Sequence, residues 1–96
     1  MQNQTTKTIR ENQKKLEGFL KGYSRARKEA NDGVYLSKTE RNNVVAMISI
    51  YRIDKMTVSN LKYILNFFAN EGTYPNLNEK KMHRICEDAR EAGLVE

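Results

Sequence analysis

The sequence has 96 residues and a mass of 11.2 kDa, which is enough for one small domain and too little for a large enzyme with a deep pocket. Hydrophobic residues make up 39% and charged residues 30% of the chain, a balance typical of a soluble globular domain. Lys and Arg number 17 against 12 Asp and Glu, so the net charge of +5 excludes an acidic mimic of DNA and favours a polyanionic partner.

The chain has one cysteine and no apolar secretory leader, so we expect a protein of the reducing cytoplasm. A single cysteine cannot form an internal disulfide. The longest apolar run, residues 44–48, is far shorter than the roughly 20 residues that cross a bilayer. We therefore expect no membrane partner.

Residues 1–8 are polar and are predicted to form a frayed tail. Over residues 9–30 the apolar side chains recur at the spacing of one helix face, which predicts a basic amphipathic helix. These side chains are Ile9, Leu16, Phe19, Leu20, Tyr23, Ala26 and Ala30. Gly18 predicts a kink or break within this helix, and Asn31-Asp32-Gly33 predicts its end.

Residues 37–96 are predicted to form a compact core of three further helices. Ser37-Lys38-Thr39-Glu40 has the form of a capping box, so the second helix begins there and buries Val44, Met47, Ile48 and Tyr51. A fresh start at Met56-Thr57-Val58-Ser59 opens a third helix that runs to about Asn70. Asn78 caps a fourth helix over residues 79–92, whose inward side is predicted to carry Met82, Ile85, Cys86 and Ala89. The whole pattern predicts an all-α domain of four helices.

The third helix is predicted to be buried on two sides. Leu61, Ile64, Leu65 and Phe68 line one face, while Tyr63 and Phe67 stand on another and are expected to pack against the first helix. Tyr51 is assigned to the core for the same reason. The alternative is that these aromatic rings stack on bases or anchor a protein partner. Gly72 and Pro75 predict a turn before the fourth helix.

The segments Thr57-Val58-Ser59-Asn60-Leu61-Lys62 and Arg90-Glu91-Ala92-Gly93-Leu94-Val95-Glu96 resemble the winged helix-turn-helix DNA-binding family over about residues 40–96. The resemblance implies that the fourth helix enters the major groove of DNA, supported by the second and third helices. It implies DNA contacts from Asn78, Lys80, Lys81, His83 and Arg84. We expect no wing, since the sequence ends at Glu96. A plain solvated surface is the alternative, because the same helix carries Glu79, Glu87, Asp88 and Glu91.

Six cations between residues 7 and 28 project within about 60° of one another at helical spacing, opposite the apolar side of the first predicted helix. They are Lys7, Arg10, Lys14, Lys21, Arg25 and Lys28, and we call them the basic stripe. Such a stripe can neutralise several phosphates of a nucleic acid. The alternative is the solvated side of an amphipathic helix, diluted by Glu11 and Glu17.

No catalytic, metal or cofactor site is predicted. His83 and Cys86 stand three residues apart on one helix, but two ligands do not make a zinc site and the chain has no other His or Cys. Cys86 is predicted to be a small core residue. The sequence contains no phosphate-binding or dinucleotide-binding glycine motif. We therefore expect a binding protein that is not an enzyme.

These features predict a small transcriptional regulator of a microbe or mobile element that binds duplex DNA. The fourth helix would meet the groove and the basic stripe would hold phosphates, and a homodimer on two half-sites is compatible with this hypothesis. The rival hypothesis is a protein-interaction bundle. It would be an adaptor or an inhibitor that phages and mobile elements direct at host machinery, such as an anti-defence protein, with the stripe docked on an acidic host protein.

Overall fold

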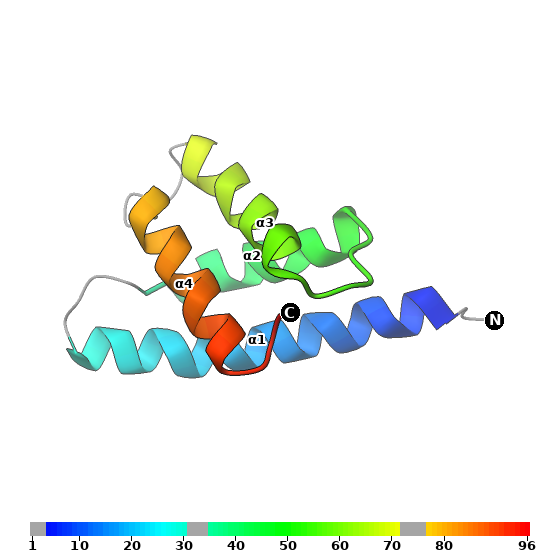
Figure 1. Cartoon of the computed structure of the whole chain (residues 1–96), viewed down its shortest axis with the longest axis horizontal. Coiled ribbons are helices and arrows are strands. Elements are labelled where there is room, and N and C mark those ends of the chain that lie inside the picture. The colour runs from blue at the N-terminus through cyan, green and yellow to red at the C-terminus, as the bar shows by residue number, and fades with distance from the viewer. Residues whose placement is uncertain (1–3, 31–34, 72–76) are drawn as a thin grey trace.

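The computed structural model describes residues 4–30, 35–71 and 77–96, which form four α-helices and no strand. They are α1 (Gln4–Ala30), α2 (Lys38–Ile50), α3 (Val58–Glu71) and α4 (Glu79–Glu91). The all-α class and the four helices predicted from the sequence are confirmed. Figure 1 shows α1 running the length of the molecule, with the other three helices above it in that view. Within the described residues, no helix is both long enough and apolar enough to cross a bilayer.

The first helix begins earlier than predicted. It starts at Gln4, so the tail expected over residues 1–8 is wrong for residues 4–8, and residues 1–3 lie outside the described part. The physical reason is cooperativity, because adding a residue to an existing helix costs little once the first turn has formed. Thr5 and Thr8 are also half-buried, so this turn is not a fully solvated segment.

The break predicted near Gly18 does not occur, because α1 is continuous through that residue. Leu16 and Leu20, on either side of Gly18, are fully buried and hold the helix against the core. Their burial outweighs the cost of about 1 kcal/mol that a glycine adds to a helix interior. The turn predicted at residues 31–33 lies outside the described residues.

The second helix starts at the predicted capping box and runs back along α1. The Ser37 hydroxyl accepts from the Glu40 backbone N–H at 3.2 Å, and the Glu40 carboxylate accepts from the Ser37 N–H at 2.9 Å. Near the end of α1, Ser24 accepts from the backbone N–H of Leu36, just before α2. Near its start, Asn12 donates to the carbonyl of Ile53, just after α2. The two helices therefore form an antiparallel hairpin.

One apolar core joins all four helices, and residues just outside the helices also contribute to it. Its buried members are Ile9, Leu16, Leu20, Leu36, Val44, Met47, Ile48, Ile53, Leu61, Ile64, Leu65, Phe68, Leu77, Met82, Ile85, Cys86, Ala89 and Val95. The positions predicted to face inward on α4 are confirmed, as are Val44, Met47 and Ile48 on α2. The helical period of the apolar residues was sufficient to place them.

The predicted burial of three aromatic residues is wrong. Tyr51, Tyr63 and Phe67 are 39%, 59% and 40% exposed. The first helix packs mainly along α2, while α3 packs mainly against α4, so the second face of α3 is left uncovered. Which helices become neighbours depends on tertiary packing, and the spacing of apolar residues within one helix does not specify it.

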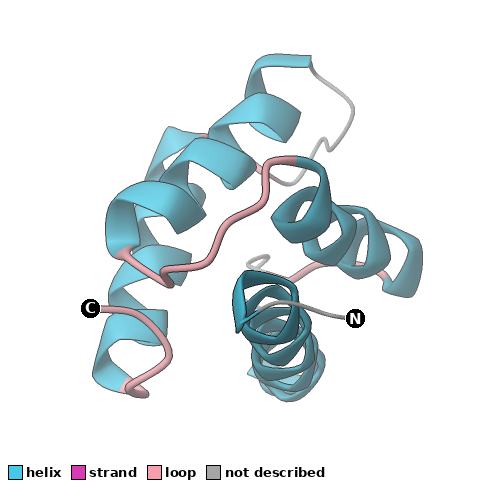
Figure 2. Cartoon of the chain, turned by 90° about the vertical axis from the view of Figure 1, so that its right-hand side faces the viewer, coloured by secondary structure: helices cyan, strands magenta, loops and turns pink. Residues whose placement is uncertain are grey.

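The C-terminal segment connects the end of α4 to the start of α3. Gly93, with a φ of +79°, ends α4, and the Leu94 N–H donates to the Ala89 carbonyl. Glu96 then lies beside the segment before α3, since its N–H donates to the Met56 carbonyl and its carbonyl accepts from the Val58 N–H. Figure 2, which looks along α1, shows α2 and α4 on opposite sides of that helix. The turn predicted around Gly72 and Pro75 lies outside the described residues.

Candidate nucleic-acid interface

All six cations of the basic stripe lie on α1, so we now call them the α1 stripe, and all six are exposed. The contacts that α1 makes with α2 and α4 show the direction in which these cations project. Gln13 and Ser24 bond to α2 and the segment before it, whereas Tyr23 and Arg27 bond to Asp88 of α4. At about 100° per residue, the centre of the stripe lies about 80° from the side that faces α2 and about 150° from the side that faces α4. The stripe therefore borders α2 and points away from α4.

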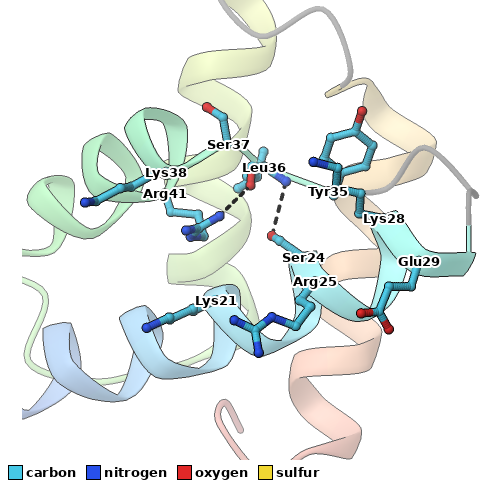
Figure 3. Close-up of a pocket in the computed structure, with 10 residues that line it drawn as sticks. All are labelled: Lys21, Ser24, Arg25, Lys28, Glu29, Tyr35, Leu36, Ser37, Lys38 and Arg41. Atoms are coloured by element: carbon cyan, nitrogen blue, oxygen red, sulfur yellow. Dashed lines mark hydrogen bonds between the residues drawn. The ribbon is translucent and has the colours of Figure 1, made fainter.

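A pocket of about 520 Å³ lies where the last turns of α1 meet the start of α2, and we call it the hairpin pocket. Figure 3 shows cationic side chains from both helices around it: Lys21, Arg25 and Lys28 from α1, and Lys38 and Arg41 from α2. Sequence reasoning found the three from α1 and missed the two from α2. The missed signal is the capping box itself, because it places Lys38 and Arg41 in the first turn of a helix that folds back on α1.

The floor of the hairpin pocket is held by hydrogen bonds to Leu36. Its backbone N–H donates to the Ser24 hydroxyl at 3.1 Å, and Ser24 is only 4% exposed. Its carbonyl accepts from the Arg41 guanidinium at 2.9 Å. Both backbone groups of a buried residue are thereby satisfied, and the connection between the helices is fixed at this point. The pocket is a built feature of the hairpin and not a gap between loose side chains.

The charge of the hairpin pocket is strongly unbalanced. Among the described residues that line it, five are cationic and Glu29 is acidic, a net charge of +4. Lys21, Arg25, Lys28 and Lys38 are exposed, and none of them pairs with a carboxylate within residues 4–30, 35–71 and 77–96. Cations gathered around one hollow raise the local concentration of anions and speed their binding.

The residues predicted to contact DNA from α4 also gather around one pocket, of about 510 Å³. It is lined by Asn78, Lys80, Lys81, His83, Arg84, Glu87 and Asp88. The charge here is nearly balanced, because Lys80, Lys81 and Arg84 stand beside the carboxylates of Glu87 and Asp88. The structure thus brings the five predicted residues together, but among acids that offset them.

Several of these α4 side chains already have partners. The Asn78 side chain caps α4 by accepting from the Lys81 backbone N–H at 2.9 Å. His83 Nε2 lies 3.2 Å from a Glu87 oxygen, and Arg84 Nε lies 3.9 Å from Asp88 Oδ2. An incoming phosphate would have to compete with these contacts. The α4 pocket is therefore the weaker candidate for an anion.

Asp88 links α4 to α1. Its Oδ2 accepts from the Tyr23 hydroxyl at 2.6 Å and pairs with the Arg27 guanidinium at 3.2 Å. Burial raises the pKa of the Tyr23 hydroxyl above its ordinary value, and the hydrogen bond to the Asp88 carboxylate raises it further. The Arg27 guanidinium also sits 5.1 Å from the centre of the Tyr23 ring. These contacts join α4 to the second half of α1.

The two cationic surfaces consequently face different directions. The hairpin pocket continues into the rest of the α1 stripe, which includes Lys7, Arg10 and Lys14, on the α2 side of the molecule. The helix that carries the α4 pocket lies on the other side of α1 from α2 (Figure 2). The structure unites the residues predicted on α1 with Lys38 and Arg41, and it separates them from the residues predicted on α4.

His83 and Cys86 do not face a common site. The thiol of Cys86 belongs to the core, with the residue 2% exposed, and its burial raises its pKa to about 11, while the His83 side chain is exposed. Across the described residues, no three His, Cys, Asp or Glu side chains gather as metal ligands.

No protein-family model, curated protein or solved structure matches this chain. Its function is therefore inferred from the two surfaces just described.

Proposed function

We propose that this chain binds nucleic acid, duplex DNA above all, by holding the phosphate backbone at the hairpin pocket. The observation that carries the proposal is the set of five cations that two helices bring around one pocket beside a single carboxylate. Four of them are exposed and have no acidic partner in the described part of the chain. Binding of this kind gains free energy from the release of counterions condensed on the phosphates.

The α1 stripe extends the contact along the duplex. Lys7 and Lys28 are 21 residues apart, which corresponds to about 31 Å along a helix. That distance matches the rise of about nine base pairs. A straight helix cannot follow the backbone over that whole length, so the pocket cations supply most of the contacts. With four to five phosphates neutralised, the logarithm of the binding constant should fall with the logarithm of salt with a slope of about −4.

Phosphate contacts position a protein on DNA and do not read its sequence. In this proposal α4 is the element that would add sequence preference, as the resemblance to winged helix-turn-helix proteins implies. Its cations lie on another side of the molecule, so the hairpin supplies affinity and α4 contributes less. A small DNA-binding protein of this kind suits transcriptional control in the cytoplasm, where the unpaired, buried Cys86 would stay reduced.

A protein-interaction bundle is the second candidate function. It is favoured by the exposed aromatic side chains on α3, which DNA-backbone binding does not use. In that case the hairpin pocket would take an acidic segment of a host protein.

Binding to duplex DNA of mixed sequence over a salt series tests the proposal. Fluorescence anisotropy from about 50 to about 300 mM salt should show tight binding at the low end and the slope given above. No detectable binding even at the lowest salt would refute nucleic-acid binding and favour an acidic protein partner.

Three double variants with the same change in net charge locate the contact. Lys21→Glu with Arg25→Glu alters the hairpin pocket and should weaken binding about 100-fold, with the salt slope reduced by about 2. Lys15→Glu with Lys55→Glu alters exposed cations outside it and is the matched control. Lys80→Glu with Lys81→Glu alters α4. Equal losses from all three variants would mean that net charge, and not the pocket, determines binding.

A further inference from the structure

A patch of exposed apolar side chains lies along α3 and the end of α2. Tyr63 and Phe67 are four residues apart and share the outer side of α3, at 59% and 40% exposure. Tyr51 is 39% exposed, and its ring meets that of Tyr63 edge to face, with 5.2 Å between ring centres. Ile50 is 66% exposed. We call these four residues the α3 patch.

The α3 patch has the size of the largest apolar patch on a typical monomer, which is often functional. Four large side chains that are 39–66% exposed amount to roughly 400 Å² of apolar surface. A stable interface buries about 800 Å² on each partner, with an apolar centre and a polar rim. The patch supplies an apolar centre of suitable size, and the exposed polar residues around it on α3 would supply the rim: Ser59, Asn66 and Asn70.

The helix α3, which carries Tyr63 and Phe67, is poor in charge. The 14 residues of α3 include two charged ones, Lys62 and Glu71, although 30% of the whole chain is charged. Charged residues are depleted at the centres of protein interfaces, where aromatic residues are enriched. A nucleic acid would need several cations beside the rings, and α3 offers one. An acidic protein would be drawn instead to the hairpin pocket. The composition of α3 thus fits an uncharged, aromatic partner surface.

We infer that the partner surface is the α3 patch of a second copy of this chain, so that the protein forms a twofold-symmetric dimer. Two copies that each carry a charge of +5 repel each other, and this face lets them approach with the least repulsion. Around a twofold axis the same patch meets itself, which places Tyr63 of one subunit near Phe67 of the partner subunit. In Figures 1 and 2, α1 lies along one edge of the molecule and α3 lies toward the opposite edge. The hairpin pockets would therefore remain accessible in the dimer.

Sedimentation equilibrium over a concentration series tests this inference independently of nucleic-acid binding. The mass should rise with concentration from 11.2 kDa toward twice that value, 22.4 kDa. Association should strengthen from about 50 to about 500 mM salt, because salt screens the repulsion between the two positive bodies. A mass that stays at 11.2 kDa up to a protein concentration of about 500 μM overturns the inference. The dissociation constant of any dimer would then lie well above that concentration, which is too weak for a dedicated interface.

Variants at the patch and away from it then locate the interface. Tyr63→Lys with Phe67→Lys should raise the dimer dissociation constant at least ~10-fold, since each substitution acts twice across a twofold axis. Ala26→Lys with Ala46→Lys adds the same charge at exposed helix positions outside the patch and should change the constant less than about threefold. Circular dichroism should show the same helix content in both variants. Equal weakening by both variants, or a wild-type dimer that dissociates as salt is raised, would overturn the inference.

Should the patch variant lose helix content, Tyr51→Lys provides the second test, because Tyr51 stands at the end of α2 and lies outside α3. It should also raise the dissociation constant, and an unchanged constant in this correctly folded variant would overturn the inference.

Discussion

Alanine in place of the two glycines inside α1 should stabilise the protein. Gly18 and Gly22 are exposed, α1 is continuous through both, and a Cβ added at either would meet no atom within 4 Å. Each glycine therefore costs backbone entropy without being required by the fold, and alanine should contribute about 1 kcal/mol at each position. The double variant should gain about 2 kcal/mol, which in a domain of this size raises Tm by roughly 8–16 °C.

Urea unfolding followed by circular dichroism measures this gain as a higher midpoint with an unchanged slope. Gly93→Ala is the matched control. A Cβ at Gly93 also meets no atom within 4 Å, but its φ of +79° strains any L-residue, so the same substitution should lose about 1 kcal/mol there. If the double variant in α1 fails to gain stability, α1 is not a continuous helix at these positions. The alignment of Lys21 and Arg25 with the rest of the α1 stripe would then be wrong as well.

Three further predictions concern single positions. Ser24→Ala leaves the buried backbone N–H of Leu36 without its partner, and urea unfolding should show a loss of about 1–3 kcal/mol. Arg52 has a φ of 51° just after α2, so Arg52→Gly should raise stability by about 1 kcal/mol, and an unchanged midpoint would argue against that left-handed conformation. The pKa of the Cys86 thiol is raised from 9.0 to about 11, which favours the protonated thiol in the folded state. Its contribution to stability is complete below about pH 9 and is lost as pH rises from about 9 through about 11. The urea midpoint should therefore fall more steeply over this range in the wild type than in Cys86→Ala.

The local features of the fold could be predicted from the sequence. The capping box at Ser37 and Glu40 is formed by residues three apart, and Asn78 caps α4 by accepting from the backbone N–H of Lys81, also three residues further on. The apolar period of α4 was enough to identify its buried side. All these signals act within one or two helical turns, so they do not depend on how the helices pack.

The features that depend on packing could not be predicted. Tyr63 and Phe67 were assigned to the core because their spacing fits a second buried face, yet none of the four described helices covers that face. The hairpin pocket was missed in part because Lys38 and Arg41 join Lys21 only when α2 folds back along α1. The α4 cations do lie together, as predicted. The sequence did not specify that Glu87 would contact His83 and that Asp88 would contact Arg84, and these contacts offset the positive charge.

Mapping the contact by NMR tests the central claim most directly. Duplex DNA is added to ¹⁵N-labelled protein at low salt, and the change in each backbone amide signal is followed. We predict that the largest changes fall on residues 21–28 and 36–41, which surround the hairpin pocket, with smaller changes along the rest of the α1 stripe. Changes confined to α4, or to the α3 patch, would contradict phosphate binding at the hairpin.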